Sequence, residues 1–223
     1  MIPTFDITNI KLVLDDVTIE PTLTLKNLGV IFDPALNMSS QVSSIVKRVS
    51  YHLRNLSRIR QHLDQDTCKK AVQSLLLSRM DNGNALLFGT TEHDLTRLQR
   101  LQNRAARLIY LVGRDTPSAP LLRRLHWLPI RKRIEFKLLV LIYKCLQKEA
   151  PLYLQELISY HTPAYETRSS LDTTLLFIPR TRTLTGDKAF QVAGPQLWNF
   201  LPSDIRLATN LDIFKKTVKD TSV

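Results

Sequence analysis

Three consecutive segments between residues 39 and 112 carry apolar side chains three or four positions apart, and this spacing limits the fold more than any other feature. Such a period places the apolar residues on one face of an α-helix. The three apolar rows are Val42, Ile45, Val46, Val49, Leu53 and Leu56; then Val72, Leu75, Leu76 and Met80; then Leu98, Leu101, Ala105 and Ile109. The pattern predicts three amphipathic helices, over Ser39–Leu63, from Asp66 to about Asn84, and from Thr91 to about Val112.

Residues that favour helix ends support these limits. Asp66 is a predicted N-cap for the second helix. Thr91 and Asp94 have the spacing of a capping box, which predicts that the third helix begins there. Gly113 is the predicted stop of the third helix, because glycine readily adopts the left-handed conformation that often follows a helix.

Strands are expected before these helices and a mixed region after them. Apolar pairs flank Asp15-Asp16, which predicts a hairpin with strands at residues 11–14 and 17–19, and Thr22–Phe32 predicts a further strand or two around Gly29. After the bundle, Pro129 suits the first turn of a helix that reaches about Gln147. The remaining expectations are a short helix at Pro151–Tyr160, extended chain over 171–193 with a strand at Leu175–Ile178, and helices at Gly194–Leu201 and Asn210–Lys219.

The sequence therefore predicts a mainly α protein with a small β portion. We expect three regions: a β portion at residues 1–36, a bundle of three helices at residues 37–115, and a helical region with a short β segment at residues 116–223. With 43% hydrophobic residues, the chain has enough apolar side chains to build a core. No apolar run approaches the ~20 residues that span a bilayer, and the N-terminus does not resemble a secretory signal.

The net charge of +11 is concentrated in the middle of the chain. Residues 1–46 hold two basic and five acidic residues, which gives −3. Residues 47–150 hold 21 basic and eight acidic residues, which gives +13, and residues 151–223 hold eight and seven, which gives +1. Nucleic acid is the commonest polyanion that binds such a basic segment. The charge also agrees with a soluble helical protein that has an ordinary charged surface.

The candidate binding residues lie on the predicted helices of this basic segment. At 100° per residue, the four arginines at positions 97, 100, 104 and 107 fall within an arc of roughly 80°, next to the apolar face of the third helix. Like charges so placed repel one another unless an anion is near. Three more cations begin the helix after Pro129, where they oppose the positive end of the helix dipole. The full candidate set is Lys47, Arg54, Arg58, Arg97, Arg100, Arg104, Arg107, Arg131, Lys132 and Arg133.

The sequence offers little support for a metal or nucleophile site. Cys68 and Cys145 have no neighbouring Cys or His at ligand spacing, and they are interpreted as reduced core thiols of an intracellular protein. The histidines, His52, His62, His93, His126 and His161, are scattered and have no partner at a recognisable spacing. No glycine-rich phosphate loop is present.

Ten short strings, in order along residues 10–220, together resemble one family. They are Lys26–Asp33; Tyr51–Asn55; Ser78–Asp81 with Asn84–Leu87; Arg97–Gln99 with Gln102–Arg107; Leu125–Ile130; Phe136-Lys137; Tyr143-Lys144; Pro179–Arg182; Ala189-Phe190; and Leu197–Asn199 with Leu201-Pro202. The strings are similar to the reverse transcriptases of non-LTR (LINE-type) retrotransposons, in the part that follows the polymerase motifs. Asn82-Gly83 stands where the family usually has an aromatic residue and a cysteine, and this pair favours a turn.

The resemblance implies a palm-end β remnant at 1–36, a thumb-like bundle at 37–115 and a carboxyl-terminal tail at 116–223. A thumb of this kind binds the backbone of RNA, DNA or an RNA–DNA duplex, which needs basic helix faces and little base reading. The polymerase palm is a further implied partner. The implied location is intracellular, cytoplasmic or nuclear, and neither secreted nor membrane-bound.

The resemblance also implies that this chain alone does not catalyse polymerisation. Polymerase chemistry needs two metal ions held by carboxylates, and in the family these carboxylates lie upstream of the strand that Lys26–Asp33 resembles. Asp15-Asp16 is therefore interpreted as a polar turn, and no catalytic or metal-binding residue and no cofactor is expected here, since Mg²⁺ would belong to the palm. Two alternatives remain: an active reverse transcriptase, and a structural or protein-interaction module or decayed element fragment that binds no nucleic acid.

Overall fold

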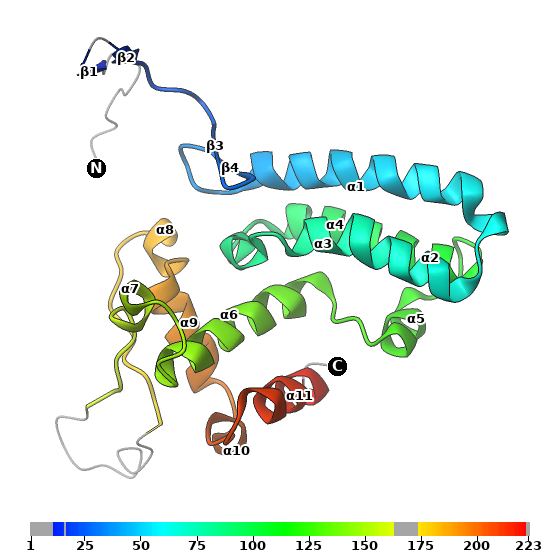
Figure 1. Cartoon of the computed structure of the whole chain (residues 1–223). Helices are drawn as coiled ribbons and strands as arrows, with labels where there is room; N and C mark the ends of the chain where they lie inside the picture. The colour runs from blue at the N-terminus through cyan, green and yellow to red at the C-terminus, as the bar shows by residue number, and fades with distance from the viewer. Residues whose placement is uncertain (1–10, 16, 163–173, 222–223) are drawn as a thin grey trace.

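The computed structural model describes residues 11–15, 17–162 and 174–221. Over these residues the chain is mostly helical, with two antiparallel sheets of two strands each, which confirms the predicted mainly α class. The strands lie near the N-terminus and are followed by a group of long helices and then by shorter ones (Figure 1). In the described part of the chain, none of the helices is both long and apolar enough to cross a membrane.

Two hairpins form the β region, at the positions where the sequence predicts strands. Their strands are β1 (Leu12–Leu14), β2 (Val17–Ile19), β3 (Leu25–Asn27) and β4 (Val30–Phe32). In the first hairpin Leu14 pairs with Val17, and the turn begins at Asp15, whose φ is 53°. In the second, Leu28 and Gly29 form the turn with φ angles of 46° and 85°, a left-handed conformation that glycine adopts without steric cost.

The predicted bundle follows these hairpins. Its elements are α1 (Ser39–Ile59), the 3-10 turn η2 (Arg60–His62), α2 (Gln65–Val72), the π-helical segment η3 (Gln73–Leu77), α3 (Ser78–Asp81), the 3-10 segment η4 (Asn84–Leu87) and α4 (Glu92–Tyr110). Figure 1 shows α1 lying along the layer that α2, α3 and α4 form. All residues of the three predicted apolar rows are buried or partly buried between these helices. The periodicity therefore identified both the helices and their inner faces.

Two of the three predicted helix ends are wrong, and one is confirmed. Asp64, not Asp66, caps α2, because its extended backbone lets the carboxylate accept hydrogen bonds from two backbone N–H groups of the first turn. α4 ends at Tyr110, because its C-cap residue Leu111 adopts the left-handed conformation with φ of 53° before the chain reaches Gly113. Thr91 caps α4 as predicted, since its hydroxyl accepts the backbone N–H three residues later at 3.2 Å.

The pair Asn82-Gly83 forms a turn between α3 and η4, as its composition predicts. Gly83 has a φ of 65°, and a Cβ atom at this position would lie 2.8 Å from Val30 Cγ2. A glycine therefore serves two needs here, because it supplies the left-handed backbone and lets β4 approach closely.

The C-terminal region is more helical than the sequence predicts. Its helices are α5 (Ser118–Leu125), α6 (Ile130–Leu146), α7 (Leu152–Gln155), α8 (Leu184–Asp187), α9 (Phe190–Asn199), α10 (Ser203–Arg206) and α11 (Leu211–Thr221). Within the described residues, the strand expected at Leu175–Ile178 is reduced to a single bridge between Leu176 and Tyr160. α8 falls where extended chain was expected, because the Thr183 side chain caps its N-terminus by accepting the N–H of Gly186 at 3.0 Å.

The buried apolar residues form two clusters, and α6 contributes to both. The first extends from Val30 through the bundle to Ile134 in the first half of α6, and therefore continues past residue 115. In the second, the Phe214 ring stacks on Tyr143 and Trp198 with centroid separations of 4.6 and 5.7 Å. The helix that links the clusters thus fixes the C-terminal region to the bundle.

Candidate nucleic-acid interface

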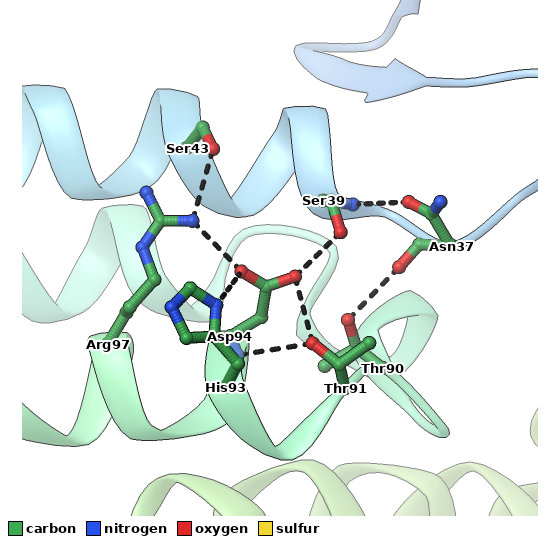
Figure 2. Close-up of polar contacts among 8 residues, drawn as sticks. All are labelled: Asn37, Ser39, Ser43, Thr90, Thr91, His93, Asp94 and Arg97. Carbon is green, nitrogen blue, oxygen red and sulfur yellow. Dashed lines mark hydrogen bonds and ion pairs between the residues drawn. The ribbon is translucent and has the colours of Figure 1, made fainter.

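α1 and α4 lie side by side and run in the same direction. Near their N-terminal ends, Ser39 Oγ donates to Asp94 Oδ2 at 2.7 Å, and Arg97 Nη1 donates to Ser43 Oγ at 3.2 Å (Figure 2). Near their C-terminal ends, Arg60 Nε, just beyond α1, donates to a backbone carbonyl in the last turns of α4 at 2.8 Å. Residues about fifty positions apart in sequence are therefore neighbours along the whole length of the pair.

Two rows of cations follow the line along which α1 and α4 meet. On α1, Lys47 and Arg54 lie between Ser43 and Ser57, and at 100° per residue these four positions fall within an arc of roughly 80°. Ser43 contacts an α4 arginine, and Ser57 lines a shallow pocket with Arg104. Because both ends of the α1 row border α4, the cations between them lie beside the arginine row of α4.

Five of the ten predicted binding residues are exposed and form no side-chain hydrogen bond or ion pair with any residue that the structure describes. We call these five the α1/α4 basic face: Lys47, Arg54, Arg58, Arg100 and Arg104. Their side chains therefore retain all their donors for an external anion. Five cations that form no ion pair with a described carboxylate repel one another, and a bound polyanion would relieve that repulsion.

The two arginines at the ends of the α4 row are bound within the chain. Arg97 Nη1 lies 2.9 Å from Asp94 Oδ1, and the side chain is 29% exposed. Arg107 Nε donates to the backbone carbonyl of Thr116 at 2.9 Å. Arg97 and Arg107 therefore help to fix α1, α4 and the following loop, while the cations between them remain available.

The three cations at the start of α6 also have partners within the chain. Arg131 pairs with Glu92 at the start of α4, and Lys132 Nζ lies 3.1 Å from a carboxylate oxygen of Glu135. Arg133 makes a two-point contact with the Asp81 carboxylate, with Nη2 at 2.6 Å from Oδ2. Their expected conflict with the helix dipole is thus offset by carboxylates of the chain itself. α6 has less need of a phosphate at this end than its sequence suggests.

Asp94 organises the edge of the α1/α4 basic face. Its carboxylate receives hydrogen bonds from Ser39, Thr91 and Arg97 (Figure 2), and the Nδ1 atom of His93 lies 3.7 Å from Oδ1. Burial, with the Asp94 side chain only 4% exposed, raises the pKa of this carboxyl, but the hydrogen bonds from Ser39, Arg97 and Thr91 together outweigh burial and lower the pKa. Asp94 is therefore held as an anion that joins the N-terminal ends of the two helices.

The structure places one further exposed cation near this face and buries another cation beside it. Arg114 is exposed and lines the same shallow pocket as Arg104, although it lies beyond the end of α4 and outside any helical row. Arg60 is 5% exposed, and its guanidinium donates to the carbonyls of Leu63, Leu108 and Ile109. Arg60 therefore caps the end of α4 and is not available to a ligand.

Two of the segments that carry the family resemblance contact each other in the structure. One is the glutamine-containing segment of α4, and the other is the tryptophan-containing segment that precedes α6. Gln102 is fully buried, and its Nε2 donates to the Leu128 carbonyl at 2.9 Å. Gln99 Oε1 accepts the N–H of Ile130 at 2.8 Å, while its amide donates to Gln102 and to Asn103. α4 thus fixes the connector that leads into α6. These polar residues of α4 act in packing rather than at an open site.

Among the residues that the structure describes, no three His, Cys, Asp or Glu side chains come together in a way that would hold a metal ion. Cys68 and Cys145 are buried free thiols, and burial raises the pKa of each. Asp15 of the acidic pair Asp15-Asp16, which was interpreted as a polar turn, lies in the turn of the first hairpin. Asp16 lies outside the described residues.

Comparison of the chain with protein-family models, with curated proteins and with solved structures yielded no match. The interpretation of the α1/α4 basic face therefore rests on its residues and their geometry.

Proposed function

We propose that this chain binds nucleic acid through the α1/α4 basic face, by contacts to phosphates, as the thumb-like part of a non-LTR retrotransposon reverse transcriptase. One observation carries the proposal. The parallel packing of α1 and α4 brings cations from two separate segments to one surface, where Lys47, Arg54, Arg100 and Arg104 have no acidic partner in the described part of the chain.

The chemistry of this face favours the phosphate backbone over the bases. Arginine donates two parallel hydrogen bonds to one phosphate, and lysine provides a point charge. The exposed side chains next to the α1 cations include Ser43, Tyr51 and Ser57, which are neutral donors or acceptors for sugar and phosphate groups. Such a surface holds a template–primer duplex without reading its sequence, and the chain itself would bind rather than polymerise.

The decisive experiment is a fluorescence-anisotropy titration of an RNA–DNA duplex at several salt concentrations. A variant with Lys47→Gln, Arg54→Gln, Arg100→Gln and Arg104→Gln is compared with one that carries Lys148→Gln, Arg180→Gln, Arg182→Gln and Lys216→Gln. Both sets consist of exposed residues and remove the same charge. The slope of log K against log salt should become shallower by about 0.9 for each lost phosphate contact in the first variant only.

Two outcomes would contradict the proposal. Equal loss of affinity in both variants would mean that net charge alone attracts the duplex, and absence of binding at low salt would favour a structural or protein-interaction module. Circular dichroism of each variant separates either outcome from unfolding. A primer-extension assay with Mg²⁺ and the isolated chain should yield no product. Formation of a product would show that the chain is a polymerase and not only a binding module.

A further inference from the structure

A pocket of about 440 Å³ lies between the π-helical segment η3, α6 and α11, away from the α1/α4 basic face. This volume is in the range of sites that hold small molecules. Trp127, in the connector before α6, and Phe136, on α6, contribute aromatic side chains to its wall, and buried leucines such as Leu77 contribute further apolar surface. A flat apolar group therefore has a complementary surface in this pocket.

Two exposed lysines make the pocket electropositive. Lys137 on α6 and Lys219 on α11 line it, and neither has an acidic partner among the residues that the structure describes. The Lys219 ammonium lies 5.3 Å from the centre of the Phe136 ring, which holds it toward the pocket wall. Asp81 also lines the pocket, but Arg133 neutralises its carboxylate through a two-point contact. The pocket thus offers two free cations to an anionic group.

Asn84 supplies an acceptor that has no donor in the described part of the chain. The residue lines the pocket and is only 4% exposed, and its amide Nδ2 donates to Asp81 Oδ1 at 3.3 Å. Its Oδ1 atom is buried and receives no hydrogen bond from the residues that the structure describes. A buried acceptor without a donor costs free energy until a ligand or water supplies one. An N–H or amino group of a ligand would satisfy it.

The wall of the pocket also contains the irregular part of the second helix. η3 departs from α-helical geometry, and its first residue, Gln73, together with Ser78 that follows it, exposes polar side chains at the pocket. Single π-helical turns inside α-helices occur often at functional sites. The π-helical segment η3 therefore lines the same pocket as the two lysines without acidic partners and as Asn84.

We propose that this pocket binds one nucleotide unit, with its phosphate at Lys137 and Lys219 and its base against the aromatic wall, beside Asn84, whose Oδ1 lacks a donor among the described residues. Every base carries an amino or ring N–H group that can donate to this oxygen. The same chemistry is offered by a free mononucleotide and by an unpaired nucleotide at the 5′ end of a strand. The inference does not rest on the α1/α4 basic face, because no residue of that face lines the pocket.

Calorimetric titration of the full chain tests the proposal with the four nucleoside 5′-monophosphates, their nucleosides and inorganic phosphate. Each monophosphate should bind at least about tenfold tighter than its nucleoside or inorganic phosphate, since the charged contacts and the base contacts are both required. The side-chain amide resonance of Asn84 should shift on binding. A 5′-phosphorylated tetranucleotide distinguishes the two sources, because a strand end predicts that it binds tighter than the monophosphate and a free nucleotide predicts the reverse.

The matched variants are Lys137→Gln with Lys219→Gln in the pocket, and Lys148→Gln with Lys216→Gln at exposed positions outside it. The first should weaken nucleotide binding about tenfold or more, and the second should leave it unchanged. The proposal is overturned if the two variants bind equally, if inorganic phosphate binds as well as the nucleotides, or if no nucleotide binds. The fourfold variant of α1 and α4 should retain nucleotide binding, so that the two proposals fail separately.

Discussion

Asp94 is the residue on which the joining of α1 and α4 most directly depends. Its buried carboxylate accepts hydrogen bonds from Ser39 on α1 and from the hydroxyl of Thr91, the N-cap of α4, and pairs with Arg97. A neutral asparagine at this position keeps the size but loses the charge. We expect Asp94→Asn to lower the free energy of unfolding by about 1–3 kcal/mol at neutral pH, because charged hydrogen bonds are lost.

The effect of Asp94→Asn should depend on pH in one direction. The pKa of Asp94 is lowered in the folded chain from an ordinary value of 3.8, so its stabilising contribution is present above that value and is lost as the pH falls through the lower, folded pKa. Urea unfolding of both proteins between about pH 7 and pH 3 should show the difference shrinking on acidification. Asp115→Asn, at an exposed position after α4, is the control. A difference that grew with acid would contradict this role.

Arg60 shows which properties of a single residue can be predicted from the sequence and which cannot. By the helical period it lies eighteen positions, about five turns, after the buried Val42 and on the same face, although it was not among the residues predicted to be buried. The same periodicity correctly placed Lys47 and Arg54 outside. What the sequence did not contain was the position of the α4 carbonyls that accept from Arg60, since these become neighbours only when α1 and α4 pack.

At the scale of elements, α6 and α9 approach closely at a glycine. A Cβ atom on Gly194 would lie 2.4 Å from Ile142 Cδ1. We expect Gly194→Ala to destabilise the chain by about 1–3 kcal/mol through overpacking. Adding Ile142→Val removes the contacted methyl group, so the double variant should be more stable than the sum of the two single effects predicts. Urea denaturation of the four proteins measures the coupling, and strictly additive effects would show that the two helices do not meet at this point.

Long periodic elements were predictable, and short elements were not. α1 and α4 repeat their apolar residues over about three to four turns, so tertiary contacts did not need to be known. α8 and α10 have four residues each, and the Thr183 cap and the neighbouring helices decide whether they form. The partners of the α6 cations were equally hidden, because Glu92 and Asp81 are distant in sequence and become neighbours only in the folded bundle.

For the whole molecule, the net charge of a segment differs from the number of cations that are available to a ligand. The excess of positive charge belongs to residues 47–150, but several of those cations, including Arg60 and Arg133, hold the fold together. The net charge of the segment therefore overstates the number of cations that a polyanion can contact. The number of unpaired cations on one surface is the better guide to the salt dependence of binding.

The two apolar clusters should unfold together, because α6 runs through both. The chain has two tryptophans, and Trp127 lies in the first cluster while Trp198 lies in the second. In Trp198→Phe the fluorescence reports on the first cluster, and in Trp127→Phe it reports on the second. Loss of either half of α6 exposes Ile134 or Tyr143 and breaks the helix that the other half continues. Within each variant, urea unfolding followed by fluorescence and by far-UV circular dichroism should therefore give coincident transitions. Transitions that separate would show that the bundle and the C-terminal region are independent folding units joined by a helix that can end in its middle.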